Sequence, residues 1–425
     1  MLLIYSHITS PRLQYICDFI FREMMGVEFS ICINSEEFKQ YEGARFNYSD
    51  LDPGAVIPAI HPHGLLFEHD IHPQDISCFE TNGNKAFFKT DNNDFPFDIL
   101  AASFYLISRY EEYLSYDKDE YGRYSHKCSL AFREGFLEIP LINIWIKGFA
   151  EMLLAKYSFL VPRSPVFQFI PTYDIDIAWS YKHKGWWRNL GGFLKKPSME
   201  RIRVLLGLQQ DPFDAYEWLH EFHEKNRLLP IYFFLVAERN GKYDKNILPF
   251  KKAMWKLVGQ HAARYPIGLH PSWQSGDHPQ LLKKEIEWLY EMSGDMTITR
   301  SRQHYIRFSM PETYRLLIEA GIREDYSMGY GTINGFRASV ANPFYWFDLE
   351  RNEVTGLQVY PFCFMDANSY YEQKLTVKQA EEEMRGYYKI CLENGGVFVS
   401  VWHNNFLGGG EWREVYEKAN SSVPV

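Results

Sequence analysis

Apolar and polar positions follow two different patterns along the chain. Over the first 160 residues, short apolar strands such as residues 27–33 are mixed with helical stretches such as residues 97–114, where apolar side chains recur three or four positions apart. This mixture predicts an α+β N-terminal domain for residues 1–160. A connector with two prolines, residues 161–165, follows, and because proline interrupts regular structure we place a domain boundary there.

Beyond this connector, apolar runs alternate with helical patterns. The apolar runs cover residues 166–170, 230–236, 266–269, 297–306, 357–364 and 396–402, and helical patterns between them include residues 214–224, 279–292 and 311–320. Strand alternating with helix is typical of a parallel α/β sheet. We therefore predict one barrel or distorted barrel for residues 165–425. In such folds the functional side chains follow the carboxyl ends of the strands.

Polar residues suited to metal binding and acid–base chemistry close four of these runs. Asp174 and Asp176 come after the first run, and extended backbone points side chains two residues apart to the same side. The others are His270, Arg302 with His304, and His403. Each could be structural when taken alone. Four strand ends of this kind favour a metal-dependent hydrolytic site, in which carboxylate and neutral imidazole hold a divalent ion.

The order of these motifs resembles the NodB-homology polysaccharide deacetylases, carbohydrate esterase family four. The similarity covers residues 167–407 and rests on Thr172-Tyr173-Asp174-Ile175-Asp176, Gly268-Leu269-His270-Pro271-Ser272, Arg302-Gln303-His304-Tyr305 and Val401-Trp402-His403. It implies a distorted (β/α) barrel of the NodB-homology type. The smaller α+β domain ahead of it is similar to an extra domain that precedes some bacterial deacetylase-like proteins.

The resemblance also implies catalytic roles. Asp174 would be the general base on a metal-bound water, and Arg302 would orient it. His403 would be the general acid that protonates the leaving amine.

The metal ligands implied by the resemblance include one departure from the family pattern. Asp176 and His270 match two ligands, but the family has a second histidine four residues after the first, where this chain has Gln274. We expect His304 to replace it, because imidazole binds zinc-like ions far better than an amide does. The alternatives are ligation by the Gln274 carbonyl oxygen and loss of the metal site. Zinc is the expected ion.

Four further residues are candidates for substrate binding. Trp273 could stack on a sugar face, and a backbone N–H near Tyr305 could bind the oxyanion of the tetrahedral intermediate. Arg337 and Asp366 each close an apolar run and could bind sugar hydroxyl groups. Core packing or an ordinary salt bridge is the alternative for each.

Charge and cysteine content narrow the partners and the compartment. The chain has 425 residues with 45 Lys and Arg against 54 Asp and Glu, a formal charge of −9, which argues against nucleic-acid binding. Its most basic stretch, residues 182–196, is interrupted by Trp and Gly. Six scattered cysteines without CxxC spacing suit reduced thiols. With no signal-like start and no long apolar run, we expect no membrane span and a cytoplasmic protein.

The strand-end residues and the family resemblance together predict a metal-dependent hydrolase that removes N-acetyl groups from an amino sugar in a polysaccharide or glycan precursor. One alternative keeps the machinery but changes the amide, as in a cyclic ureide hydrolase. Another is a non-catalytic carbohydrate-binding relative that has lost the metal, and Gln274 makes it credible. Metal content separates the last alternative from the two enzymes.

Overall fold

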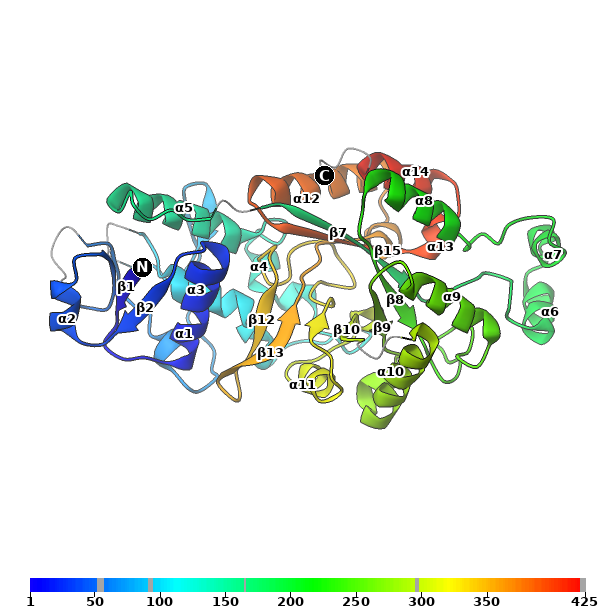
Figure 1. The fold of residues 1–425 in the computed structure, drawn as a ribbon, viewed down its shortest axis with the longest axis horizontal. Coiled ribbons are helices and arrows are strands. Elements are labelled where there is room, and N and C mark those ends of the chain that lie inside the picture. Colours follow the sequence, from blue (N-terminus) through cyan, green and yellow to red (C-terminus); the bar gives the residue numbers. More distant parts are fainter. Residues whose placement is uncertain (52–56, 91–94, 164–165, 295–297, 421–425) are drawn as a thin grey trace. The chain divides into compact units, whose positions relative to one another are not determined.

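The computed structural model describes residues 1–51, 57–90, 95–163, 166–294 and 298–420 (Figure 1). The chain divides into two compact units that are interleaved along the sequence. Unit 1 comprises Met1–Gln168, Phe336–Pro361 and Ile390–Val397, and unit 2 comprises Phe169–Gly335, Phe362–Lys389 and Phe398–Val425. The predicted domains, by contrast, are continuous. Their boundary falls partly on Ser164 and Pro165, which lie outside the described residues, so it stays a prediction.

Unit 1 contains a parallel sheet in the order β2-β1-β3-β4, with all four residues of β1 buried. Strands buried in this way are typical of parallel sheets covered on both faces. The strands of unit 1 are β1 (Leu2–Tyr5), β2 (Phe29–Cys32), β3 (Ala44–Tyr48), β4 (Ala59–Ile60), β5 (Phe79–Thr81), β6 (Asn84–Ala86), β12 (Phe344–Asp348) and β13 (Glu353–Val359). Its α-helices are α1 (Pro11–Cys17), α2 (Ser35–Gln40), α3 (Ile99–Ile107), α4 (Leu130–Arg133) and α5 (Leu141–Lys156).

Unit 2 is built on strands in the order β11-β10-β9-β8-β7-β15-β14. Strand β10 is parallel to β11 and β9, β8 is parallel to β7 and β9, and β14 is parallel to β15. The strands are β7 (Gln168–Ile175), β8 (Ile231–Leu235), β9 (Ile267–His270), β10 (Arg300–Ser301), β11 (Glu324–Asp325), β14 (Phe364–Met365) and β15 (Val397–His403). The helices are α6 (Trp186–Lys195), α7 (Met199–Leu205), α8 (Tyr216–Asn226), α9 (Lys252–Ala262), α10 (Pro279–Ser293), α11 (Glu312–Glu319), α12 (Val377–Glu393), α13 (Asn404–Leu407) and α14 (Glu411–Asn420). The predicted α/β class is confirmed, whereas closure into a barrel stays a prediction.

Three predicted strands differ from those observed. The run at residues 166–170 is only the start of β7, which continues to Ile175, so that Asp174 lies within the strand and Asp176 directly after it. The run at residues 357–364 is two strands, because Pro361 has no N–H to donate and separates β13 from β14. In the run at residues 297–306 only β10 is strand, and Thr297 lies outside the described residues.

A buried asparagine ties together the strand ends that carry the candidate residues. Asn246 donates to the carbonyl oxygens of Ile175 and Leu235, at 3.0 Å each, and its Oδ1 accepts from the N–H of Ala178 at 2.9 Å. These bonds satisfy backbone groups at the ends of β7 and β8 that the sheet leaves unpaired. The backbone around Asp176 is therefore held against β8.

Gly268 in β9 provides a test of packing near these strand ends. A Cβ atom there would lie 2.5 Å from the Phe233 ring and 3.0 Å from Arg300 Cβ, and the Phe233 ring in turn carries the guanidinium of Arg302 at 4.6 Å. We predict that Gly268→Ala lowers the free energy of unfolding by about 1–3 kcal/mol through overpacking, as measured by urea denaturation.

The control is Gly356→Ala in β13, where no heavy atom lies within 4 Å of the added Cβ. This variant should unfold at about the same urea concentration as the natural chain. Equal destabilisation by both substitutions would show that close packing at Gly268 is not the cause.

Candidate active site

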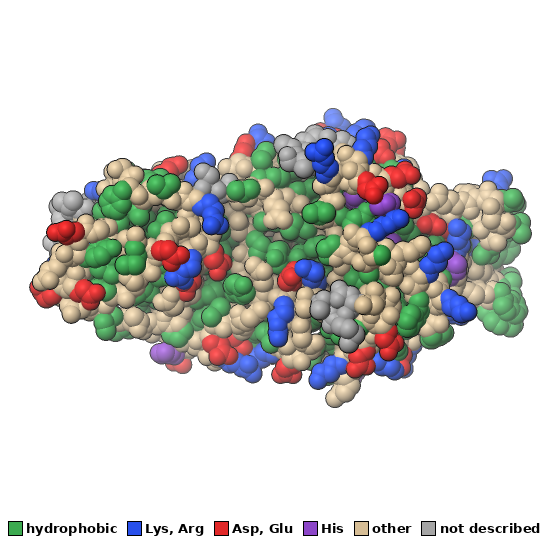
Figure 2. Space-filling model, viewed as in Figure 1, with side chains coloured by type: hydrophobic (Ala, Val, Ile, Leu, Met, Phe, Trp, Pro, Cys, Tyr) green, Lys and Arg blue, Asp and Glu red, His purple; other side chains and the backbone are tan. Residues whose placement is uncertain are grey.

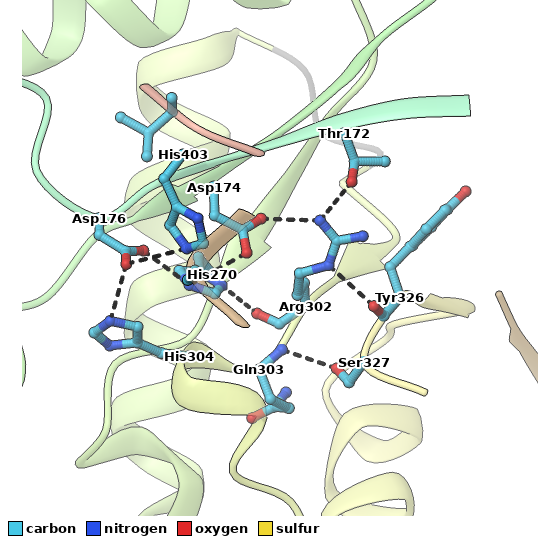
Figure 3. A network of polar contacts seen from close by, with 12 residues as sticks. Thr172, Asp174, Asp176, His270, Arg302, Gln303, His304, Tyr326, Ser327 and His403 are labelled. Carbon is cyan, nitrogen blue, oxygen red and sulfur yellow. Dashed lines mark hydrogen bonds and ion pairs between the residues drawn. The ribbon is translucent and has the colours of Figure 1, made fainter. Parts of the chain in front are cut away.

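The carboxyl ends of parallel strands place six of the predicted residues in one cluster within unit 2 (Figure 3). Asp174 and Asp176 come from the end of β7, and His270 is the last residue of β9. The cluster also includes Arg302 just after β10, His304 at the start of the short 3₁₀ turn His304–Ile306, and His403 at the end of β15. The strand-end rule accounts for this convergence.

A backbone carbonyl fixes the orientation of the His270 ring. Its Nδ1 donates to the carbonyl oxygen of Arg302 at 2.5 Å. Since a carbonyl oxygen can only accept, Nδ1 carries the hydrogen, and in the neutral ring the lone pair is on Nε2. Nε2 lies 3.0 Å from Asp176 Oδ1 and 3.9 Å from Asp174 Oδ2. The free nitrogen of His270 therefore faces both carboxylates.

His304 is held in the same way by a carboxylate. Its Nδ1 lies 3.0 Å from Asp244 Oδ1, and its Nε2 lies 3.5 Å from Asp176 Oδ2. Burial alone would lower the pKa of His304, but the charges and hydrogen bonds of Asp176 and Asp244 outweigh it and raise the pKa to about 9. The sequence analysis did not select Asp244, because it lies in a loop with no apolar run before it to mark a strand end.

The donor set of Asp176, His270 and His304 fits a divalent ion. One ligand atom from each lies within 4.8 Å of the others, and Asp176 Oδ1 is buried without a hydrogen bond. Burial favours the neutral form of Asp176, but His304 and His270 outweigh it and hold its pKa well below the ordinary value. Two imidazoles and one carboxylate that leave a position open are typical of catalytic zinc. A carbonyl or carboxylate behind each imidazole is the usual support for such ligands.

Gln274, the alternative third ligand, is engaged elsewhere. Its carbonyl oxygen, Oε1, accepts a hydrogen bond from Arg239 Nε at 3.0 Å. The structure thus places His304 next to Asp176, whereas the side-chain carbonyl of Gln274 is hydrogen-bonded to Arg239.

Asp174 and Arg302 form a buried ion pair beside the metal candidates. Arg302 Nη1 donates to Asp174 Oδ1 at 3.0 Å and to Thr172 Oγ1 at 2.6 Å, and its Nε donates to the carbonyl oxygen of Tyr326 at 3.0 Å. Both side chains of the pair are at most 2% exposed. Bonds from a guanidinium to a carboxylate are among the stronger hydrogen bonds in proteins. Arg302 therefore fixes one oxygen of Asp174 and leaves Oδ2 toward His270.

His403 and Asp366 form a second pair, next to Asp176. His403 Nδ1 lies 2.6 Å from Asp366 Oδ1, and its backbone N–H donates to Oδ2 at 2.6 Å. Its Nε2 lies 3.7 Å from Asp176 Oδ2. Burial would lower the pKa of His403, but Asp366 above all, with Asp176 and Asp174, raises it to about 10. The imidazole is therefore protonated at neutral pH.

Asp366 and Arg337 were candidates for binding sugar hydroxyl groups, and the structure shows both buried and in ion pairs. Asp366 is fully buried behind His403, so it orients that ring and is not positioned to bind sugar hydroxyls. Arg337 belongs to unit 1, where its buried guanidinium donates to Glu112, which also accepts from Arg109. Each buried residue pairs with a side chain of opposite charge, and the sequence pattern around it does not reveal that partner.

Trp273 and Tyr305 lie beside the metal candidates together with a third ring. The Tyr305 ring centroid is 4.6 Å from that of His304 and 5.7 Å from that of Trp273, and Tyr243 stacks on Trp273 at 4.0 Å. Tyr305 adopts φ 59° and is 36% exposed. Because Asp244 also accepts from the N–H of Trp273 at 3.0 Å, one carboxylate positions both His304 and this aromatic cluster.

Comparison with protein families finds a match for the N-terminal part of the chain. A family of unknown function, DUF7033, matches residues 2–158. No curated protein matches the chain.

Three solved structures are similar to it at low identity. A protein described as a polysaccharide deacetylase from Mycobacterium smegmatis has 15% identity and a TM-score of 0.42, over 61% of this chain and 84% of that one. Puue Allantoinase has 11% identity and a TM-score of 0.40, over 60% and 83%. A protein described as a polysaccharide deacetylase from Pseudomonas aeruginosa PAO1 has 11% identity and a TM-score of 0.39, over 60% and 83%.

The first prediction for this site concerns metal content. We predict that His270→Ala and His304→Ala each remove bound zinc from the protein, as measured by elemental analysis after dialysis. Gln274→Ala should retain zinc, because the Gln274 side chain accepts a hydrogen bond from Arg239 and is not a proposed ligand. Asp244→Asn should weaken zinc binding by about 10- to 100-fold, since it alters the support of His304 and none of the proposed ligand atoms. Zinc that is lost in Gln274→Ala but kept in His304→Ala would reverse the assignment.

The second prediction concerns the pH dependence of zinc binding. Because the pKa of His304 is raised to about 9 in the metal-free protein, its ring is protonated at neutral pH and must lose that proton to bind zinc. The apparent affinity should therefore fall about tenfold for each unit that the pH drops below about 9. Competition with a chelator at several pH values measures this slope. An affinity that does not change between neutral pH and pH 9 would contradict it.

Proposed function

We propose that this protein is a metal-dependent hydrolase that removes an N-acetyl group from an amino sugar in a polysaccharide or glycan precursor. The observation that carries the proposal is the arrangement around Asp176. The candidate metal ligands lie close to a carboxylate paired with arginine and to an imidazole paired with aspartate. Amide hydrolysis requires these three elements: activation of water, a base, and an acid for the leaving nitrogen.

Asp174 is the proposed general base. Arg302 holds its Oδ1, and the other oxygen faces the metal ligand His270. Asp176, His270 and His304 would hold the ion, zinc in this proposal, which polarises the amide carbonyl and lowers the pKa of a water molecule when it is bound. Asp174 Oδ2 would accept a proton from the attacking water molecule. A carboxylate fixed on one oxygen presents the other in a constant direction, which favours proton transfer.

His403 is the proposed general acid. Its raised pKa keeps a proton on the ring at neutral pH, and its bond to Asp366 through Nδ1 directs Nε2 toward Asp176. A proton on Nε2 can then be donated to the amine nitrogen as the carbon–nitrogen bond breaks. Asp366 acts as a positioning residue in this step.

The aromatic cluster of Tyr243, Trp273 and Tyr305 supports a sugar as the substrate. Flat aromatic faces beside His304 offer apolar surface to a ring-shaped substrate. In this proposal the backbone N–H of Tyr305 contributes to binding of the oxyanion. The complete donor set argues against the non-catalytic carbohydrate-binding alternative, and the aromatic surface favours a sugar over a small cyclic ureide.

The compartment is part of the proposal. All six cysteines are free thiols, and four of them are buried, which fits a reducing environment. We place the enzyme in the cytoplasm, acting on a glycan precursor.

Substitution of the base and of the acid tests the mechanism. We predict that Asp174→Asn abolishes release of acetate from N-acetylated amino-sugar oligomers but leaves zinc in place. His403→Ala should lower kcat by about 100-fold or more, also with zinc retained, because neither side chain is a proposed ligand. Acetate release and zinc content are measured on the same samples.

The alkaline limb of the rate profile distinguishes the acid from a merely structural residue. With the pKa of His403 raised to about 10, the rate should fall as the pH rises through that value, and His403→Ala should remove the fall. If Asp174→Asn emptied the site while Asp176→Asn kept it filled, the two carboxylates would exchange roles. If neither Asp174→Asn nor His403→Ala altered acetate release, the proposed catalytic site would be wrong.

A further inference from the structure

Helices α6 and α7 form a hairpin between β7 and α8 whose apolar side chains are exposed. None of the residues of α6 is buried. Trp186, Trp187 and Leu194 are 62%, 70% and 74% exposed, and Trp186 and Trp187 stack on each other. Large apolar side chains gathered on a surface usually mark a binding surface. The active site does not use this hairpin, so its exposure requires a separate explanation.

The two sides of α6 differ in chemistry. At about 100° per residue, its apolar residues fall within an arc of about 120°. They are Trp186, Trp187, Leu190, Phe193 and Leu194. Arg188 and Lys195 lie near the centre of the opposite side. This is the pattern of a helix that lies in an interface between apolar and aqueous phases.

The apolar surface continues onto the second helix. A groove of about 570 Å³ runs between the helices and is lined in part by Trp186, Phe193, Ile202 and Leu205. Leu206 and Leu208, which follow α7, are 68% and 75% exposed. Figure 2 shows hydrophobic side chains gathered at the end of the view where Figure 1 places α6 and α7.

The charge of the hairpin opposes that of the whole chain. Residues 181–210 contain seven basic residues and one acidic residue, Glu200, whereas the chain as a whole has a formal charge of −9. The basic residues are Lys182, Lys184, Arg188, Lys195, Lys196, Arg201 and Arg203. A local positive charge of this size on an acidic protein attracts an anionic surface.

The base of the hairpin is fixed to the rest of unit 2. The carboxylate of Asp211 accepts from the N–H groups of Ser180, Tyr181 and Lys182 at 2.8–2.9 Å. These bonds join the segment that enters the hairpin to the segment that leaves it. The hairpin is therefore presented from a closed base, a few residues after Asp176.

We propose that this hairpin docks on the surface of an anionic lipid bilayer. Trp186, Trp187 and Leu194 enter the headgroup region, and the Lys and Arg side chains contact lipid phosphates. Tryptophan is enriched at this depth of a bilayer because its ring is amphipathic. The combination of apolar and cationic groups fits a lipid surface, which offers both an apolar interior and anionic headgroups. Among the described residues, no helix has the length and apolar character of a membrane span.

Sedimentation of the full-length protein with vesicles tests this inference. We expect the protein to sediment with vesicles of phosphatidylglycerol and phosphatidylcholine in equal parts, and less with pure phosphatidylcholine. Trp186→Ser combined with Trp187→Ser should lower binding to the anionic vesicles by about tenfold or more. Lys195→Glu combined with Lys196→Glu should lower it by a similar factor, since each basic residue near the surface contributes to attraction. Added salt should weaken binding of the natural chain.

Matched controls alter exposed residues outside the hairpin. Leu229, 78% exposed just before β8, is changed to Ser, and the two exposed lysines Lys283 and Lys378 are changed to Glu. These variants should bind as the natural chain does. Failure of the natural chain to sediment with anionic vesicles, or equal loss in the controls, would overturn the proposal. So would a dimer that the Trp186→Ser and Trp187→Ser pair converts to a monomer without any vesicle binding, because the hairpin would then contact a second copy. None of these outcomes depends on hydrolytic activity.

Discussion

The orientation of two imidazole rings, each fixed by a hydrogen bond at Nδ1, determines which chemistry this site can support. His270 donates through Nδ1 to the carbonyl oxygen of Arg302, and His304 pairs through Nδ1 with Asp244. Each bond leaves Nε2 directed at Asp176. If either Nδ1 partner were lost, the ring could rotate or change tautomer, and the ligand set would no longer converge. The proposed metal binding would thus depend on hydrogen bonds that contain none of the metal-facing atoms.

Arg302 connects this site to the sheet. Its carbonyl oxygen orients His270, its guanidinium fixes Asp174, and the guanidinium lies over the ring of Phe233 in β8. A buried arginine needs several partners because desolvating its charge is costly. Because Gly268 has no side chain, there is room for the Phe233 ring over which the Arg302 guanidinium lies. The geometry of the candidate site and the packing of the strands are therefore linked through the side chain of Arg302.

The sequence predicted the members of the site better than it predicted their supports. The residues at strand ends, Asp176, His270 and His304 among them, could be selected as candidates because apolar runs mark strands and parallel strands end together. The structure brings one ligand atom from each of these three within 4.8 Å of the others. Asp244 lies in a loop, where no periodic pattern applies. Asp366 was recognised as a candidate, but its role was not, because a buried partner is identified only from three-dimensional contacts. The exposure of α6 also required the structure, since its apolar residues alone would fit a core helix.

X-ray absorption spectroscopy of the zinc-loaded protein tests whether Asp176, His270 and His304 hold the metal. We expect coordination by nitrogen and oxygen only, with two imidazole ligands at about 2.0–2.1 Å and a carboxylate oxygen. The His304→Ala variant, loaded at high zinc concentration, should show one imidazole fewer. A shell that contains sulfur, or one whose imidazole count is unchanged in His304→Ala, would contradict the assignment of Asp176, His270 and His304 as the metal site.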